Sequence, residues 1–337
     1  MPRTKELLAV VAMLAVSACG DSASTSAAPD GTPMNQPLTP PPSASTCQGA
    51  PFPIILAHGM AGFERIGPLN YFFNVATDLR SRGEVVFESQ VSPYDSSSVR
   101  GSELAQFVDE TLRATSACKV NIIAHSQGGL DARYLISSLH YGDRVAALVT
   151  VGTPHQGTPV ADVVLGLVTP SGFTAAVVND ILLGVQGLTS NDTGNPNVKA
   201  NLAQLATASI KQWNLENPDD LRVKYYSVAG RSSLASGATE CAGGVWPNPK
   251  GVDLLNPLLS VPATVFPFFS PNPLVPIPND GLVPVTSARW GRFLGCVPAD
   301  HFDEVGQIAE LTADPLSGFD HLVLYRQLVS VLRSDTL

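Results

Sequence analysis

Basic side chains are scarce in this sequence. Of its 337 residues only 20 are lysine or arginine, against 29 aspartate or glutamate, so the formal net charge is −9 at pH 7. Nucleic-acid binding needs lysine and arginine gathered into a stripe or patch, and no such stripe occurs. We therefore expect no nucleic-acid partner. Charged residues make up just 15%, while glycine and proline number 28 each, which predicts a loop-rich and fairly apolar surface.

Internal repeats are absent too, and no apolar run after the N-terminal segment could span a membrane. The N-terminal run, at residues 7–16, follows Arg3 and Lys5 and is too short to span a bilayer as a mature helix. A short positive start before such a run is typical of an export signal. We therefore expect residues 1–18 to be a signal peptide and the protein to be exported.

The signal peptide ends in Val16-Ser17-Ala18-Cys19, which resembles the lipobox of bacterial lipoproteins. The resemblance implies cleavage before Cys19 and acylation of that cysteine, and two or more acyl chains anchor a protein stably to a membrane. Because Gly20 rather than aspartate follows Cys19, the resemblance favours the outer membrane or cell surface. Ordinary cleavage after Ala18, which would give a fully secreted product, is the alternative.

Residues 19–46 are rich in serine, threonine, alanine and proline and show no apolar periodicity. Such a segment cannot bury enough apolar surface to fold, so we expect a flexible tether. The remaining residues, 47–337, are within the size range of a single α/β core. We therefore expect one folded domain behind the tether.

Predicted strands and helices alternate from residue 52 onwards. Strands are expected at residues 52–57, 85–91, 120–123, 145–151 and 223–228, and helices at residues 69–80, 103–114, 130–139 and 323–332. This alternation predicts an α/β fold with a mostly parallel central sheet and helices on both faces. Residues 158–214 form a long insertion with short apolar runs, which is either a lid or a set of additional packing helices.

The stretch from Val120 to Leu130, V-N-I-I-A-H-S-Q-G-G-L, is the most informative in the chain. Its apolar β-branched start predicts a strand buried on both faces, and a helical pattern begins directly after the turn. A strand, a tight turn with serine at its tip and a helix are the context that makes G-x-S-x-G a nucleophile elbow. Alanine replaces the first glycine here, and its methyl group still lets the turn close. Ser126 is therefore the candidate nucleophile.

A serine hydroxyl is a poor nucleophile unless a base takes its proton, and the chain contains six histidines. His301 lies in the loop P-A-D-H-F-D, which can carry an imidazole to Ser126. We expect structural roles for the other five: His58, His125, His140, His155 and His321. His301 is therefore the candidate base.

The imidazolium formed on His301 needs a carboxylate partner. In elbow-type sites the chain order is serine, acid, histidine, which Asp280 in P-N-D-G satisfies and Asp303 does not. Asn-Asp-Gly is also a common turn, so a purely structural role for Asp280 is the alternative. The developing oxyanion needs N–H donors. We expect them from the backbone of Gln127, directly after the nucleophile, and of Met60, after the first strand.

Five cysteines are present, and with Cys19 assigned to lipid four remain: Cys47, Cys118, Cys241 and Cys296. In an oxidising compartment these four allow three pairings. We favour Cys241 with Cys296, which would fasten a loop-rich region near the candidate acid and base, and Cys47 with Cys118 as the complement. Free buried thiols are the alternative.

Several segments form a specific set: P-I-I-L-A-H-G-M-A-G-F at residues 53–63, residues 91–101, residues 120–129, T-V-G-T-P-H-Q-G at residues 150–157, N-D-G-L-V at residues 279–283 and H-F-D-E-V at residues 301–305. Together they resemble the bacterial true lipases of the Pseudomonas and Burkholderia type, closely over about residues 50–158 and then in isolated segments. The resemblance implies an α/β-hydrolase fold with a movable lid. It also implies hydrolysis of long-chain acyl esters, often triacylglycerols, by Ser126, Asp280 and His301 with an oxyanion hole from Met60 and Gln127.

The same resemblance implies a structural Ca²⁺ near the catalytic histidine. Its ligands would include the Asp303 carboxylate and the main-chain carbonyls of Gln307 and Leu311, which are hard oxygen donors of the kind that Ca²⁺ prefers. A second carboxylate is expected further upstream in the chain, where Asp253 and Asn256 are the alternatives.

We therefore predict a serine carboxylic-ester hydrolase, a lipase that acts through an acyl-enzyme intermediate. We expect a monomer, for which a lipase foldase is a candidate folding partner. A polyester depolymerase is the nearest alternative, because the apolar, proline-rich run at residues 261–278 could line a groove. An acyltransferase, with an alcohol replacing water, and a non-catalytic surface lipoprotein are the others.

Overall fold

A computed structural model describes residues 46–60, 62, 65–66, 69–170, 173–174, 196–232, 241–249, 251, 253–257, 259–271, 277–307 and 317–334. The predicted signal peptide, Cys19, the tether up to residue 45 and Leu311 lie outside these residues. Within them, no helix has both the length and the apolarity needed to cross a bilayer.

Six parallel strands form the central sheet, in the order β4-β1-β5-β6-β7-β8. Every residue of β1 and β5 is buried, which explains why the two strands are almost entirely apolar in sequence. A separate antiparallel pair joins β2 to β3. The strand bounds are β1 Ile54–Ala57, β2 Arg65–Ile66, β3 Leu69–Asn70, β4 Val86–Glu88, β5 Val120–His125, β6 Val145–Val151, β7 Lys224–Gly230 and β8 Arg292–Val297.

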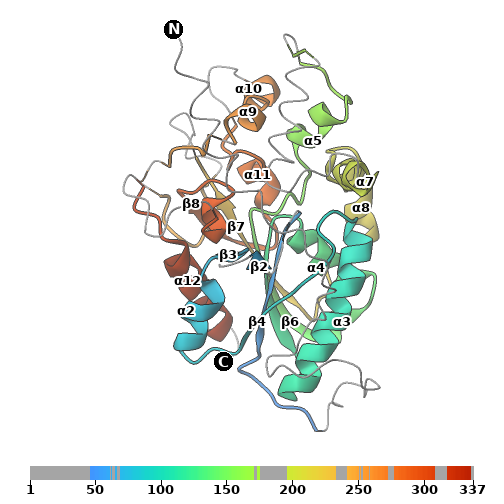
Figure 1. Cartoon of the computed structure of the whole chain (residues 1–337), viewed down its shortest axis with the longest axis vertical. Coiled ribbons are helices and arrows are strands. Elements are labelled where there is room, and N and C mark those ends of the chain that lie inside the picture. The colour runs from blue at the N-terminus through green and yellow to red at the C-terminus, as the bar shows by residue number, and fades with distance from the viewer. Residues whose placement is uncertain are drawn as a thin grey trace. The chain divides into compact units, whose positions relative to one another are not determined.

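Helices cover both faces of this sheet (Figure 1). The helices α2 (Val75–Ser81) and α12 (His321–Ser334) share one buried apolar core with alternate strand residues such as Ile54 and Leu56. The helices α3 (Ser97–Thr115) and α4 (Gly128–Ser137) share the other core with the intervening residues. The predicted α/β fold, with helices on both faces of a parallel sheet, is confirmed.

The insertion after β6 contributes three described helices: α5 (Pro159–Val164), α7 (Pro196–Leu205) and α8 (Ser209–Glu216). Leu205 and Ile210 form a buried cluster with Leu130 and Ala161, so this part of residues 158–214 packs against the start of α4. The remaining short elements are η2 Tyr141–Asp143, α9 Ser260–Ala263, α10 Phe266–Phe269, α11 Val285–Ala288 and η3 Asp303–Val305.

Several elements differ from the sequence prediction, among them the strand expected at residues 85–91, which is shorter at Val86–Glu88. The helix expected at residues 69–80 begins only at Val75, because residues 69–70 pair with β2 and Asn74 takes a left-handed conformation with φ 57°. The helix expected from residue 103 begins at Ser97. The strand β8 was not predicted. It contains Gly295, where its pairing with β7 shifts register, and glycine inside a strand weakens the β signal.

Both favoured disulfides are present, and their prediction is confirmed. Cys47 is bonded to Cys118, two residues before β5, and Cys241 is bonded to Cys296 within β8. The second bond lies in the same buried cluster as Val283, so it fastens the edge of the sheet beside the loop that carries Asp280.

Candidate active site

Ser126 lies at the tip of a sharp turn between β5 and α4. Its φ of 54° is left-handed, a conformation that costs a non-glycine residue on the order of 1–3 kcal/mol. Two hydrogen bonds to its backbone hold it there. The Ser126 N–H donates to the Val151 carbonyl at 2.9 Å, and the Ser126 carbonyl accepts from the Thr153 hydroxyl at 2.7 Å. A Cβ at Gly128 would lie 2.5 Å from the Ala57 carbonyl, so the elbow requires glycine there. The predicted strand–turn–helix context is present.

Ser126, His301 and Asp280 converge at the carboxyl edge of the sheet. Nε2 of His301 lies 2.9 Å from the Ser126 Oγ, and Nδ1 of His301 lies 2.8 Å from Oδ2 of Asp280. The other Asp280 oxygen accepts two backbone N–H groups, from Leu282 at 2.9 Å and from Val283 at 2.6 Å. A carboxylate fixed in this way orients the imidazole toward the hydroxyl. The arrangement can activate a serine for attack on a carbonyl carbon.

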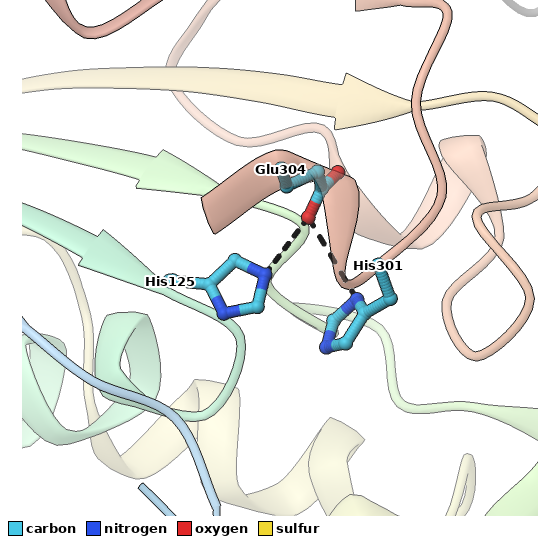
Figure 2. A group of neighbouring side chains, drawn as sticks. All are labelled: His125, His301 and Glu304. Atoms are coloured by element: carbon cyan, nitrogen blue, oxygen red, sulfur yellow. Dashed lines mark hydrogen bonds and ion pairs between the residues drawn. The ribbon is translucent and has the colours of Figure 1, made fainter. Parts of the chain in front are cut away.

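A second buried carboxyl group, Glu304, faces the same imidazole (Figure 2). Its Oε2 lies 2.9 Å from Nε2 of His125 and 3.7 Å from Nδ1 of His301. Burial, and next the charge of Asp280, raise the pKa of Glu304 well above its ordinary value. Gly152, with φ 56°, makes room for this group, since a Cβ there would collide with Oε2 of Glu304.

His125, for which the sequence predicts a structural role, is enclosed in this buried network. Its Nδ1 lies 2.6 Å from the Tyr71 hydroxyl, and only 1% of the residue is exposed. Burial, and then the nearby His301, lower the pKa of His125 well below its ordinary value. A neutral His125 satisfies both contacts when Nδ1 accepts from Tyr71 and Nε2–H donates to Glu304.

The two expected oxyanion donors come from two different segments of the chain. Gln127 is the N-cap of α4, directly after the nucleophile, and is fully buried, while Met60 lies in the loop after β1. Arg100 of α3 holds this loop: one of its nitrogens donates to the carbonyls of His58 at 2.7 Å and Gly59 at 3.1 Å.

Arg100 is itself fully buried and paired with Asp131 of α4 through Nε, at 2.7 Å. Burial raises the pKa of Asp131 to about 6 although the guanidinium opposes this shift. Burial, and then the charge of Arg100, lower the pKa of His58 to about 3, so this imidazole is neutral. His58 contacts the Gly59 carbonyl through Nδ1 at 2.9 Å, and Arg100 fixes the direction of the His58 and Gly59 carbonyls.

Three carboxylates meet in the segment that carries the base. Ligand oxygens of Asp253, Asp300 and Asp303 all lie within 4.8 Å of one another. Asp300 accepts backbone N–H groups from Asn256 at 2.7 Å and from Asp303 at 3.0 Å. Burial, above all, raises the pKa of Asp300.

Of the predicted calcium ligands, Asp253 and Asp303 are thus brought together, and Asp300 joins them. The side-chain amide of Gln307 donates to the Tyr71 carbonyl at 3.3 Å, and Leu311 lies outside the described residues. Placing three carboxylates so close is costly without a cation, and hard oxygen donors suit Ca²⁺. The donor set therefore fits this metal.

Sequence reasoning missed Arg100, Asp300 and Glu304. Each is a charged residue that is buried, and burial cannot be read from a loop or from one turn of a helix. Position gave some signal for two of them, since Asp300 directly precedes His301 and Glu304 follows it by three residues.

The chain is similar to several lipases. A family model described as palmitoyl protein thioesterase matches residues 53–206. The chain is 30% identical to a triacylglycerol lipase of Vibrio cholerae, over 85% of this chain and 89% of that protein. It is 32% identical to a triacylglycerol lipase of Burkholderia plantarii, over 60% and 56% of the two chains. It is 27% identical to one of Pseudomonas fragi, over 77% and 89%.

Solved structures agree in fold. The crystal structure of the mature Bacillus licheniformis lipase BlEst2 matches with a TM-score of 0.57 at 19% identity, covering 86% of this chain and 94% of that chain. The Staphylococcus hyicus lipase matches with a TM-score of 0.57 at 16% identity, covering 84% and 96%. The lipase-type α/β-hydrolase fold expected from the sequence is therefore confirmed.

Proposed function

Because the chain belongs to the triacylglycerol lipase family and is a serine carboxylic-ester hydrolase, we propose that Ser126, His301 and Asp280 carry out its reaction. Ser126 Oγ attacks the ester carbonyl while His301 Nε2, 2.9 Å away, takes its proton. Asp280 stabilises the imidazolium through Nδ1. The alcohol leaves with the proton held on His301, and an acyl group remains on Ser126. Water, deprotonated by His301, then releases the carboxylic acid.

The negative charge that develops on the carbonyl oxygen needs preorganised donors. The backbone N–H groups of Gln127 and Met60 supply them, and each such donor stabilises the transition state by roughly 3–4 kcal/mol. Arg100 keeps the Met60 loop in place through the carbonyls of His58 and Gly59. The hydrogen bond between Ser126 and His301 is the observation on which this proposal rests.

The substrate is a long-chain acyl ester such as triacylglycerol. Met60 and Phe269 are partly buried and pack against an apolar cluster that includes Val163 of α5 and Phe266 of α10. These two partly buried side chains offer an acyl chain an apolar surface beside the oxyanion loop. Large apolar side chains are exposed on or beside these two helices, since Leu167, three residues after α5, is 60% exposed and Phe268 of α10 is 50% exposed. Such exposure suits contact with a lipid surface. The insertion at residues 158–214, which contains α5, acts as the lid.

Esters of increasing acyl length test this assignment. We expect kcat/KM for p-nitrophenyl esters to rise from acetate to longer chains and emulsified triacylglycerol to be cleaved. Equal or better turnover of acetate, with no cleavage of triacylglycerol, would leave an esterase of small substrates. The comparisons do not favour a polyester depolymerase, an acyltransferase or a non-catalytic lipoprotein.

Calcium is the proposed structural metal. Asp253, Asp300 and Asp303 would hold it, together with the carbonyls that the family resemblance assigns to Gln307 and Leu311. A bound divalent cation would neutralise these carboxylates and tie the residues before and after His301 to the segment around Asp253.

An exported location agrees with the two disulfides. Acylation at Cys19 would anchor the enzyme to the outer membrane or cell surface, while the tether at residues 19–46 lets the catalytic domain reach its substrate. Labelling with a radioactive fatty acid tests the anchor, and we expect the label to be lost in Cys19→Ala. The proposed active form is a monomer, with a lipase foldase as a candidate partner during folding.

A further inference from the structure

A cavity of about 310 Å³ opens at the edge of the sheet opposite the catalytic serine. Asn121, Ala147 and Lys224, near the first residues of β5, β6 and β7, line it, while Ser126 follows the last residue of β5. Asn121 and Ser126 are five positions apart along an extended strand, a distance of roughly 16 Å. The cavity is therefore separate from the proposed active site.

Asn121 is an unusual residue for its position. It lies in the central strand β5 and is completely buried, with 0% of its surface accessible to solvent. Alternation places its side chain on the face of Ile123, which belongs to the core shared with α12. Neither Nδ2 nor Oδ1 has a hydrogen-bond partner among the described residues. A buried amide of this kind is costly unless something in the cavity bonds to it.

Three cations surround the same cavity: Lys119, Arg222 and Lys224. Arg222 forms an ion pair with Asp220: its Nε donates to Oδ1 at 2.9 Å and its Nη2 donates to Oδ2 at 2.6 Å. Lys119 is partly buried; burial, and then Arg222, lower its pKa, while Asp143 and Asp220 act in the opposite direction. In a chain of net charge −9, this concentration of basic side chains favours an anion.

The rest of the wall is mainly apolar. Phe52, Leu332 and two alanines of β6 contribute to it, and Leu332 is 1% exposed. An inorganic anion would leave this surface without a partner. We propose that the cavity binds a small amphiphilic anion, a carboxylate or phosphate group on a short alkyl chain. Lys119, Lys224 and the Asn121 amide contact the head group, and Phe52 and Leu332 contact the chain.

Titration calorimetry on the full chain tests this site. The ligands are octanoate, octyl phosphate, inorganic phosphate and octan-1-ol, so that the two head groups, the bare anion and the uncharged chain are compared. We expect octanoate, octyl phosphate or both to bind at least tenfold more tightly than inorganic phosphate and octan-1-ol. The tighter of the first two identifies the source of the head group. Octan-1-ol or inorganic phosphate binding as tightly as either amphiphile would overturn the proposal.

Variants separate this cavity from the site at Ser126, which can also bind a fatty acid. Asn121→Leu and Lys224→Gln should each weaken binding about tenfold, and the exposed Lys224 makes the second change safe for folding. Lys211→Gln, on the exposed face of α8, is the matched control and should bind normally.

Crystals soaked with 8-bromooctanoate give an independent test. An anomalous bromine peak beside Phe52 and Leu332 is expected. Binding that Asn121→Leu and Lys224→Gln both leave unchanged, or a peak only beside Ser126, would overturn the proposal. Failure of both octanoate and octyl phosphate to bind would also overturn the proposal, since water would then be the partner of Asn121.

Discussion

Oε2 of Glu304 lies 3.7 Å from Nδ1 of His301, the nitrogen that Asp280 contacts at 2.8 Å. Two buried carboxyl groups therefore face one nitrogen of the proposed base. Two negative charges this close are mutually unfavourable, so burial and Asp280 together raise the pKa of Glu304. Asp280 accepts two backbone N–H groups, whereas Glu304 keeps its proton to higher pH than a free glutamate.

Exchanging each carboxyl group for an amide separates the two roles. Asp280→Asn should lower kcat by about 10⁴, because the imidazole loses the acceptor that fixes its tautomer. Glu304→Gln alone should change kcat little, since glutamine still accepts from His125. In the Asp280→Asn background it should lower kcat further by removing the second carboxyl group beside Nδ1. Ester hydrolysis by the four proteins measures this coupling, and strictly additive effects would contradict it.

The raised pKa of Glu304 also predicts how stability depends on pH. The folded protein holds this proton more tightly than the unfolded chain, whose ordinary value is 4.5. The stability contributed by protonated Glu304 is thus fully present below that value and is lost as pH rises toward the folded pKa. Glu304→Gln cannot lose a proton there. Its Tm relative to the native protein should increase steadily with pH, as measured by calorimetry, and a constant difference would contradict the prediction.

Arg100 should affect catalysis and stability through different contacts. Arg100→Met leaves Asp131 buried without its cation, and removing one partner of a buried pair costs about 3–5 kcal/mol of unfolding free energy. Arg100→Met with Asp131→Leu should recover much of that stability. Its kcat should stay low, because the carbonyls of His58 and Gly59 have lost their donor. Denaturant unfolding and ester hydrolysis measure the two effects.

The matched control for Arg100 is Arg113→Met in the same helix, half-buried near its C-terminus, for which we expect small changes in both quantities. Full activity in the Arg100→Met, Asp131→Leu double variant would show that Arg100 does not position the oxyanion loop.

Calcium removal should lower stability before it affects chemistry. We expect EDTA to reduce Tm by roughly 5 °C, because a ligand present well above its Kd stabilises the folded state by a few kcal/mol. Asp300→Asn should abolish this response, whereas Asp143→Asn, on the exposed 3-10 turn after α4, should retain it. A native protein whose Tm is indifferent to both EDTA and added Ca²⁺ would rule out the metal.

Local patterns were sufficient for much of the fold. Buried parallel strands are mainly apolar, so β1, β5 and β6 could be predicted, and the turn at Ser126 is defined by its own neighbours. β8 escaped prediction because Gly295 interrupts its pattern and its pairing with β7 slips there. Local sequence carries no information on such tertiary contacts.

The site shows the same division. Ser126 is defined by the elbow, while Asp280 and His301 could be found by chain order and by excluding other histidines. Glu304 and Arg100 act through partners far away in sequence: Glu304 contacts His125 across 179 positions, and Arg100 contacts Asp131 across 31. Only the folded chain brings these groups together.

The kcat of Ser126→Ala with a p-nitrophenyl ester tests the proposed mechanism most directly. Ser126, His301 and Asp280 act as a unit, so we expect kcat to fall about 10⁶-fold. Ser137→Ala, at the end of α4, is the control and should remain close to the native rate. A Ser126→Ala protein that folds and retains most of its turnover would contradict the assignment of Ser126 as the nucleophile.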